Sequence, residues 1–284
     1  MHRYNKSHEH VGVILRNFAS NPQDVEKRAK MTVEAINLLE GLASRIDVLI
    51  HADKRFAEKD RDCGQLADAI LKHGDIRNGA DVAVQEVHFG DLFCGLLNFG
   101  IAKQSRLGCE YSLILSPDAA SYATRETMNE VLAAASRGAL AVGVAIGELS
   151  ESIREGRLAN TFCLWHNQSL QTVGGFDLKA AKPVDDRLAH YLRGSSDGRE
   201  VYYQLAGVEE MIPLARMVEH FGACLAVVEP KGEGAAYEVP DPVTQPELYQ
   251  RHLSKFGTKF ERQATLLGGA GFDFSWLRGG VMKP

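Results

Sequence analysis

The chain has 284 residues, of which 45% are hydrophobic and 24% are charged, with a formal net charge of -5. The composition is that of a globular protein, and the negative charge argues against one that coats nucleic acid, because such binding relies on Lys and Arg to neutralise phosphates. No apolar signal segment opens the chain and no apolar run could span a bilayer, so we expect a cytoplasmic protein.

Strand and helix patterns alternate through the first half of the chain. Apolar runs of β-prone residues at 11–15, 46–50, 81–87, 111–115 and 139–146 predict five strands. Apolar residues at spacings of three and four predict helices at 21–43, around 66–71, at 91–105 and at 124–136. This order implies right-handed crossovers and a mainly parallel α/β sheet with helices on both faces. Ligands are expected at the carboxyl ends of its strands.

Three groups of residues narrow this interpretation. A segment from Gly90-Asp91 to Asn98-Phe99-Gly100 precedes a strand that ends in Ser116-Pro117-Asp118. Farther along, Thr161 to Trp165 precede Val173-Gly174-Gly175-Phe176-Asp177. Finally, Glu209-Glu210 is followed by Arg216, seven residues beyond Glu209, and then by Gly222.

In this order, over residues 11 to about 229, the groups resemble the family 2 glycosyltransferases. They correspond to the helix and strand that carry the D-x-D motif, the G-G-F-D acceptor loop and the E-D-x-x-L-x-x-R helix. The sequence departs from the family where Ser116 replaces the first aspartate of D-x-D, where His51 to Lys54 replace a D-x-S-x-D pattern, and where Glu210 replaces the aspartate of E-D.

The resemblance implies a GT-A-like, or Rossmann-like, fold. It divides the chain into a polar tail (1–10), a donor half (11–147), a loop-rich acceptor half (148–229) and a C-terminal extension (230–284). The extension contains a basic run from Arg251 to Arg262, which we expect to be either a lid over the donor or a solvated helix face.

Functional roles follow from the resemblance and from position at the strand ends. Candidate donor-binding residues are Asn17, Asp53, Gly90, Asn98 and Asp118, and candidate acceptor-side residues are Trp165, Gly174, Gly175 and Asp177. Asn17 is equally expected to form a turn. A divalent cation, Mn2+ or Mg2+, would be held by Asp118, with His252 as a further ligand, and would neutralise the leaving diphosphate.

The paired glutamates carry the catalytic hypothesis. Glu209 or Glu210 is expected to remove the proton of the acceptor hydroxyl, or, alternatively, only to stabilise a helix start. The sequence thus predicts a transferase that moves a sugar from a nucleoside diphosphate sugar to a hydroxyl acceptor. Two alternatives stay open. A nucleotidyltransferase is expected to have a glycine-rich loop, whereas residues 16–20 contain no glycine, and a catalytically silent relative is favoured by Ser116.

Overall fold

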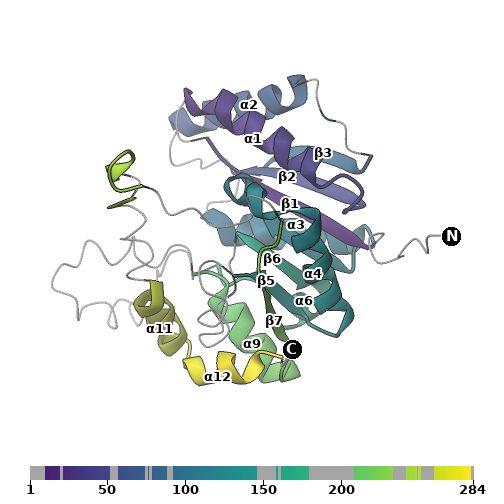
Figure 1. Ribbon diagram of the computed structural model, residues 1–284, viewed down its shortest axis with the longest axis vertical. Helices are drawn as coiled ribbons and strands as arrows, with labels where there is room; N and C mark the ends of the chain where they lie inside the picture. Colours follow the sequence, from purple (N-terminus) through teal and green to yellow (C-terminus); the bar gives the residue numbers. More distant parts are fainter. Residues whose placement is uncertain are drawn as a thin grey trace.

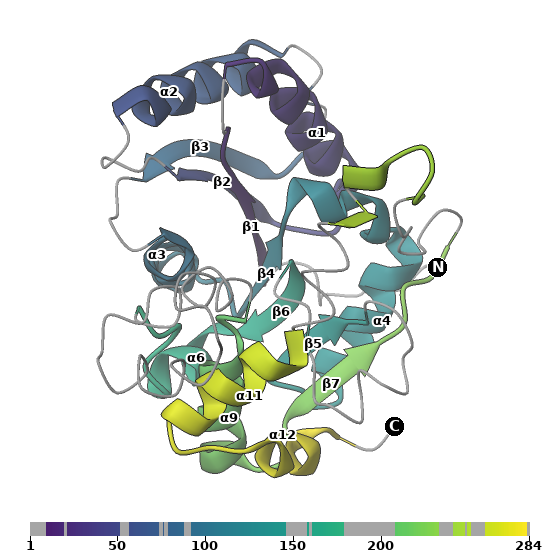
Figure 2. The same cartoon turned by 90° about the vertical axis from the view of Figure 1, so that its left-hand side faces the viewer.

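A seven-stranded sheet forms the centre of the computed structural model, which describes residues 10–19, 22–51, 57–73, 76, 79–87, 92–145, 158, 161–178, 208–232, 241–247, 249–250 and 259–282. The strand order is β3-β2-β1-β4-β6-β5-β7 (Figure 2). The strands are β1 (Val11–Asn17), β2 (Arg45–His51), β3 (Asp81–Val87), β4 (Tyr111–Leu115), β5 (Ala141–Val144), β6 (Phe162–His166) and β7 (Leu225–Val228).

The sheet is mainly parallel, as the sequence predicts. Strand β6 is the exception, because it runs antiparallel to both β4 and β5. An antiparallel neighbour needs no crossover helix, so the alternation of helices and strands in the sequence carries no signal for its direction. The predicted strands 81–87 and 111–115 match β3 and β4, and the others differ only at their ends.

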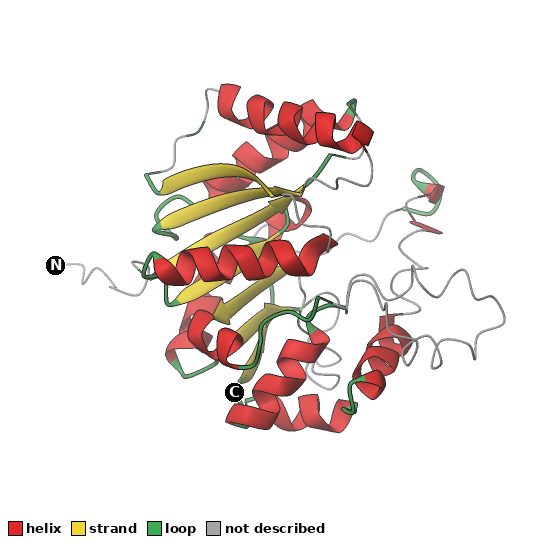
Figure 3. Ribbon diagram, turned by 180° about the vertical axis from the view of Figure 1, so that it is seen from behind, coloured by secondary structure: helices red, strands yellow, loops and turns green. Residues whose placement is uncertain are grey.

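Helices cover both faces of the sheet (Figures 1 and 3). One apolar core lies under α1 (Asp24–Leu38), α2 (Ala57–Lys72) and α4 (Arg125–Ser136). The other lies under α3 (Leu92–Arg106), α6 (Asn167–Thr172), α9 (Met211–Phe221), α11 (Lys259–Gly269) and α12 (Phe274–Gly280). No described helix combines the length and apolar character needed to cross a membrane.

Strand β1 illustrates why the central strands are apolar throughout. Val13 and Leu15 are buried in the core of the α1 face, whereas Ile14 between them is buried in the core of the α3 face. A parallel strand covered on both sides reads as a continuous apolar run, because successive side chains point to opposite faces. This burial fixes the carboxyl end of β1, and with it Arg16 and Asn17, near the middle of the edge formed by the carboxyl ends of the strands.

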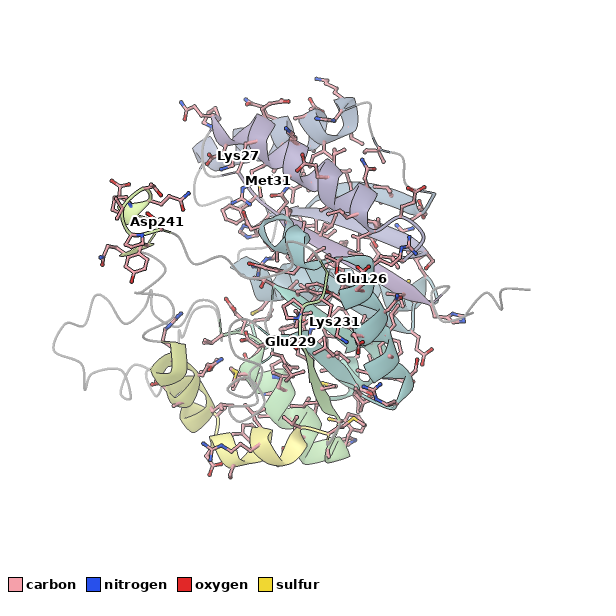
Figure 4. The ribbon with its side chains drawn as sticks, in the orientation of Figure 1. Lys27, Met31, Glu126, Glu229, Lys231 and Asp241 are labelled. Atoms are coloured by element: carbon pink, nitrogen blue, oxygen red, sulfur yellow. The ribbon has the colours of Figure 1, made fainter. Side chains whose placement is uncertain are left out.

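The end of β7 is tied to the start of α4. The backbone N–H of Lys231 donates to Thr127 Oγ1 at 2.8 Å, and Lys231 Nζ lies 2.6 Å from Glu130 Oε1. Glu126 and Glu229 lie near Lys231 in this region (Figure 4). Thr124 caps α4 by accepting from the N–H of Thr127 at 3.1 Å. The segment that follows β7 is therefore attached to α4 by side-chain contacts.

Helices α11 and α12 of the C-terminal extension pack against α9, and they bury Leu266, Leu267 and Leu277 in the core. The N–H of Cys224 donates to the carbonyl of Gly280 at 2.9 Å, and that of Met282 donates to Leu225 at 2.8 Å. A Cβ atom at Gly280 would lie 2.1 Å from Cγ2 of Val218, so only glycine fits this contact. Most of the basic run predicted to form a lid, residues 251–258, lies outside the described residues.

Candidate active site

The donor-side and acceptor-side motifs meet around Arg16. Strands β1 and β4 pair in parallel up to Leu15 and Leu115, so their carboxyl ends lie side by side. Arg16 continues β1 beyond this pair, and Asp118 follows β4 in the short 3-10 helix η2 (Pro117–Tyr122). The charges of Glu209, Glu210 and Asp118 all act on the Arg16 guanidinium. Carboxylates from two distant parts of the sequence therefore lie within electrostatic range of this one cation of β1.

The surroundings of Arg16 are both enclosed and negatively charged. Burial lowers the pKa of Arg16 below its ordinary value, and the neighbouring charges of Glu209, Glu210 and Asp118 counteract that shift. Arg16 keeps part of its surface exposed. Arginine stays protonated at neutral pH even when its pKa falls, and Arg16 is thus a fixed positive charge at the strand ends.

The two glutamates are buried at the start of α9. Glu209 is 2% exposed and Glu210 is 0% exposed, and Glu210 is the N-cap residue of the helix. Arg262 of α11 is also buried, and burial lowers its pKa while the charges of Glu209 and Glu210 raise it. Buried carboxylates are tolerated when cations compensate them, and here Arg16 and Arg262 supply that compensation from β1 and α11. The predicted helix start is confirmed.

Asp118 is more accessible and forms an ion pair. Its side chain is 55% exposed, its Oδ2 lies 2.7 Å from Nη1 of Arg28 in α1, and the same oxygen accepts from Ser116 Oγ at 3.3 Å. The Arg28 guanidinium lies 5.2 Å from the centroid of the Phe18 ring. A cation, an anion and an aromatic ring are therefore gathered just beyond β1 and β4.

Asp118 fits a divalent cation only as a single protein ligand. The described residues contain no group of three or more His, Cys, Asp or Glu side chains that could hold a metal ion. Mg2+ and Mn2+ commonly keep waters and take phosphate oxygens, so one exposed carboxylate suits a cation that arrives with a diphosphate. His252, the other predicted ligand, lies outside the described residues, as do the predicted donor residues Asp53 and Gly90.

Asn17 uses its amide within the protein. It is buried, its Nδ2 donates to Thr32 Oγ1 of α1, and its Oδ1 accepts from the N–H of Phe18 at 2.9 Å. Both polar ends of the side chain thus hold the turn after β1 against α1. This arrangement agrees with the interpretation of Asn17 as a turn-forming residue.

The G-G-F-D loop is held by Asn98 of α3. Nδ2 of Asn98 donates to the carbonyl of Phe176, and its Oδ1 accepts from the N–H of the same residue, both at 2.8 Å. Gly174 and Gly175 have φ values of 91° and 70°, which favour glycine. A Cβ atom at Gly175 would lie 2.6 Å from Asn98 Oδ1, so the amide fits only against glycine. The structure places Asn98 under this loop, in contact with its backbone.

The G-G-F-D loop is also held by a core side chain of β6 and by an arginine of α9. Trp165 is 0% exposed and packs edge-on against Phe176, with ring centroids 5.2 Å apart. Asp177 Oδ2 lies 3.6 Å from Nη2 of Arg216, which belongs to α9. The predicted acceptor-side residues are thus brought together, with Trp165 supporting the loop from the core and Asp177 at its half-buried end.

The three arginines of this site were not among the predicted site residues. Arg16 adjoins Asn17 at a strand end, and Arg262 closes the basic run, so position and local charge are signals that point to both. Arg28 has no comparable signal. It occurs within an amphipathic helix, and its role depends on the distance between α1 and η2, which the sequence does not contain.

No protein-family model and no curated protein matches the chain. Among solved structures, it is similar to the mannosyltransferase PcManGT from Pyrobaculum calidifontis in complex with GDP-Man and Mn2+. The two chains are 13% identical, the match covers 92% of this chain and 75% of the other, and the TM-score is 0.45. Similarity at this level assigns no donor, metal or residue role to this chain.

Proposed function

We propose that this chain is a glycosyltransferase of the GT-A type that moves a sugar from a nucleoside diphosphate sugar to a hydroxyl acceptor. One observation carries the proposal: Asp118 from the donor-side motif and Glu209-Glu210 from the acceptor-side motif share the electrostatic surroundings of Arg16. Sugar transfer that inverts the anomeric carbon needs a cationic site for the leaving diphosphate and a carboxylate that accepts a proton. Both kinds of group occur here at the carboxyl ends of the strands.

On the donor side, the diphosphate binds near Arg16 and Asp118. The fixed charge of Arg16 attracts phosphate oxygens and stabilises the negative charge that develops on them as the sugar leaves. Asp118 would hold a divalent cation, which when bound supplies Lewis-acid stabilisation of the same charge. Asn17 positions this end of β1 by fixing the turn against α1.

On the acceptor side, the transfer step forms a bond between the acceptor oxygen and the anomeric carbon of the sugar. The bond from that carbon to the diphosphate oxygen breaks, and its electron pair leaves with the diphosphate. The acceptor proton passes to a glutamate carboxylate, for which we propose Glu210. Asn98 and Arg216 hold the G-G-F-D loop, so that Asp177 accepts a hydrogen bond from an acceptor hydroxyl.

A catalytically silent nucleotide-sugar binder is the second candidate, and the burial of the glutamates favours it. A carboxylate that is 0% exposed, as in Glu210, contacts an acceptor only after the segments around it move. A silent relative would retain the buried charges for stability and would bind the donor without turnover. The two candidates differ in one observable, the release of nucleoside diphosphate.

The test uses a panel of UDP-, GDP- and ADP-sugars, each with and without Mn2+. Thermal shift first measures whether each nucleotide sugar binds. Release of nucleoside diphosphate in the presence of simple sugar acceptors then measures turnover. A ligand at 100 times its dissociation constant adds about 2.7 kcal/mol to the free energy of unfolding. Stabilisation with turnover supports the transferase, and stabilisation without turnover supports the silent binder. If no nucleotide sugar stabilises the protein, both candidates are wrong.

A further inference from the structure

Arg28 and Asp118 form an ion pair beside the proposed donor site. Arg28 belongs to α1 and Asp118 to η2, and their contact of 2.7 Å joins two elements at the carboxyl ends of β1 and β4. The carboxylate that suits a metal is therefore occupied by a cation of the protein. Since the Arg28 side chain is 21% exposed and that of Asp118 is 55% exposed, the pair lies within reach of solvent and of a ligand.

Arg28 keeps the capacity to bind an anion. Within the described part of the chain, its Nη1 donates to Asp118, while its Nε and Nη2 have no hydrogen-bond partner. The guanidinium lies near the face of Phe18, which limits the directions in which its donors point. A planar fork with unused donors matches the geometry of phosphate oxygens.

We propose that Arg28 binds the diphosphate of the donor, and that the Arg28–Asp118 pair opens when the diphosphate and its divalent cation bind together. Arg28 then contacts a phosphate oxygen and Asp118 contacts the cation. This inference rests on the proposed function, because it takes a nucleoside diphosphate as the leaving group. It assigns a binding role to a helix residue outside every motif of the sequence.

Charge balance explains why the exchange is favourable. Without ligand, Arg28 and Asp118 neutralise each other, and an exposed pair of this kind is only weakly stabilising. The negative diphosphate takes the place of Asp118 as the partner of Arg28. The divalent cation takes the place of Arg28 as the partner of Asp118. Either ligand alone leaves one residue of the pair facing a like charge. Cation and diphosphate therefore bind cooperatively at this site.

Isothermal titration calorimetry of the full chain tests this inference with three probes: MnCl2 alone, pyrophosphate alone, and pyrophosphate with Mn2+. The variants are Arg28→Gln, Arg28→Lys and Asp118→Asn. Lys27→Gln is the matched control, because Lys27 is the preceding residue of the same helix, is exposed, and lies on α1 (Figure 4).

We expect Arg28→Gln to weaken binding of pyrophosphate with Mn2+ roughly tenfold, and to tighten binding of Mn2+ alone, because Asp118 loses its competing cation. Asp118→Asn should do the reverse for single ligands, weakening Mn2+ and tightening pyrophosphate alone. The affinity of Arg28→Lys for pyrophosphate with Mn2+ should lie between those of wild type and Arg28→Gln, and the affinities of Lys27→Gln should match those of wild type. Thermal unfolding of each variant verifies that the fold is intact.

Equal affinity of wild type and Arg28→Gln for pyrophosphate with Mn2+ would overturn the inference, and so would a loss of Mn2+ affinity in Arg28→Gln. Failure of the proposed function gives a different pattern. In that case no nucleotide sugar is turned over or bound, while the opposite responses of Arg28→Gln and Asp118→Asn to the simple probes persist. Normal turnover by Arg28→Gln would refute the role of Arg28 and leave the glycosyltransferase proposal standing.

Discussion

Buried charge gathers at both ends of the central sheet, but it is organised differently at each end. At the amino end, Asp47 of β2 is fully buried and accepts hydrogen bonds from Arg45 at 2.9 and 3.0 Å and from Gln104 at 3.1 Å. Gln104 contacts Oδ2 of Asp47, and Lys103 Nζ lies 2.8 Å from Oδ1 of the same carboxylate. The amino-end cluster thus attaches the last turn of α3 to β2 through short, direct contacts.

At the carboxyl end, the charges come from β1, α1, η2, α9 and α11, and they include the half-exposed Asp118. A carboxylate surrounded by donors of two neighbouring elements, such as Asp47, has no capacity left for a ligand. A cluster assembled from distant segments with one accessible carboxylate has that capacity. Burial of charge alone is therefore a poor guide to a ligand site, and accessibility and the number of contributing segments are better guides.

The largest expected effect concerns Glu210 at the carboxyl end. If it is the general base, Glu210→Gln should lower transfer by about 10² to 10⁴ while donor affinity stays nearly unchanged. Glu209→Gln should be less harmful, because Glu210 is the residue proposed to accept the proton. Glu219→Gln, an exposed change later in α9, is the control. Inverted product from two fully active glutamate variants, determined by NMR, would remove both residues from the mechanism.

The second prediction concerns the amino end. Asp47→Asn should reduce the free energy of unfolding by about 3 kcal/mol, because it removes a fully buried carboxylate and leaves the partly buried cations Arg45 and Lys103 without their shared partner. Urea denaturation measures this, and turnover per folded molecule should not change. Asp81→Asn is the matched control, since Asp81 also pairs with Arg45 but is 68% exposed, and we expect a loss of at most about 1 kcal/mol. Lost turnover in folded Asp47→Asn would contradict the division between the two ends.

A third prediction separates two glycines of the acceptor loop. Alanine at either Gly174 or Gly175 should cost about 1 to 2 kcal/mol of stability, because both have positive φ. Gly175→Ala should cost more, since its Cβ meets Asn98 Oδ1 at 2.6 Å, whereas Gly174 has only Arg216 Nη1 at 3.6 Å. Thermal unfolding of both variants measures the difference. Equal losses would mean that the contact with Asn98 does not determine the loop geometry.

The smallest effect is a pH dependence that arises at the amino end. Burial raises the pKa of Asp47, but hydrogen bonds from Arg45, Lys103 and Gln104 lower it more, so its net pKa lies below the ordinary value. This stabilisation is therefore complete above the unfolded pKa of about 3.9, and is lost as the pH falls below it. The free energy of unfolding should decrease in acid by up to about 1.4 kcal/mol per pH unit for this group. The Asp47→Asn variant should have a shallower slope.

Local patterns predicted the strands and helices well, because β3, β4 and α4 are defined by apolar spacing and by caps such as Thr124. The antiparallel direction of β6 was not predictable, since it depends on the path of the chain and not on composition. For the site, the motifs pointed to Glu209, Asp118 and the G-G-F-D loop. The partner Arg28 was not predictable, because it meets Asp118 only through the packing of α1 against η2. The basic run pointed to Arg262, but not to the buried glutamates beside it.

The contact between β7 and residues 280–282 bears on how the protein is made. Met282 and Val281 add backbone pairing to Leu225, so one edge of the sheet is complete only when residues far later in the sequence are available. During synthesis, β7 emerges from the ribosome well before this partner, and an unpaired strand edge is a template for association with other chains. The nascent chain thus exposes the outer edge of β7 until residues 281–282 are available to pair with it, and we expect protection of that edge by a chaperone to raise the yield of folded protein.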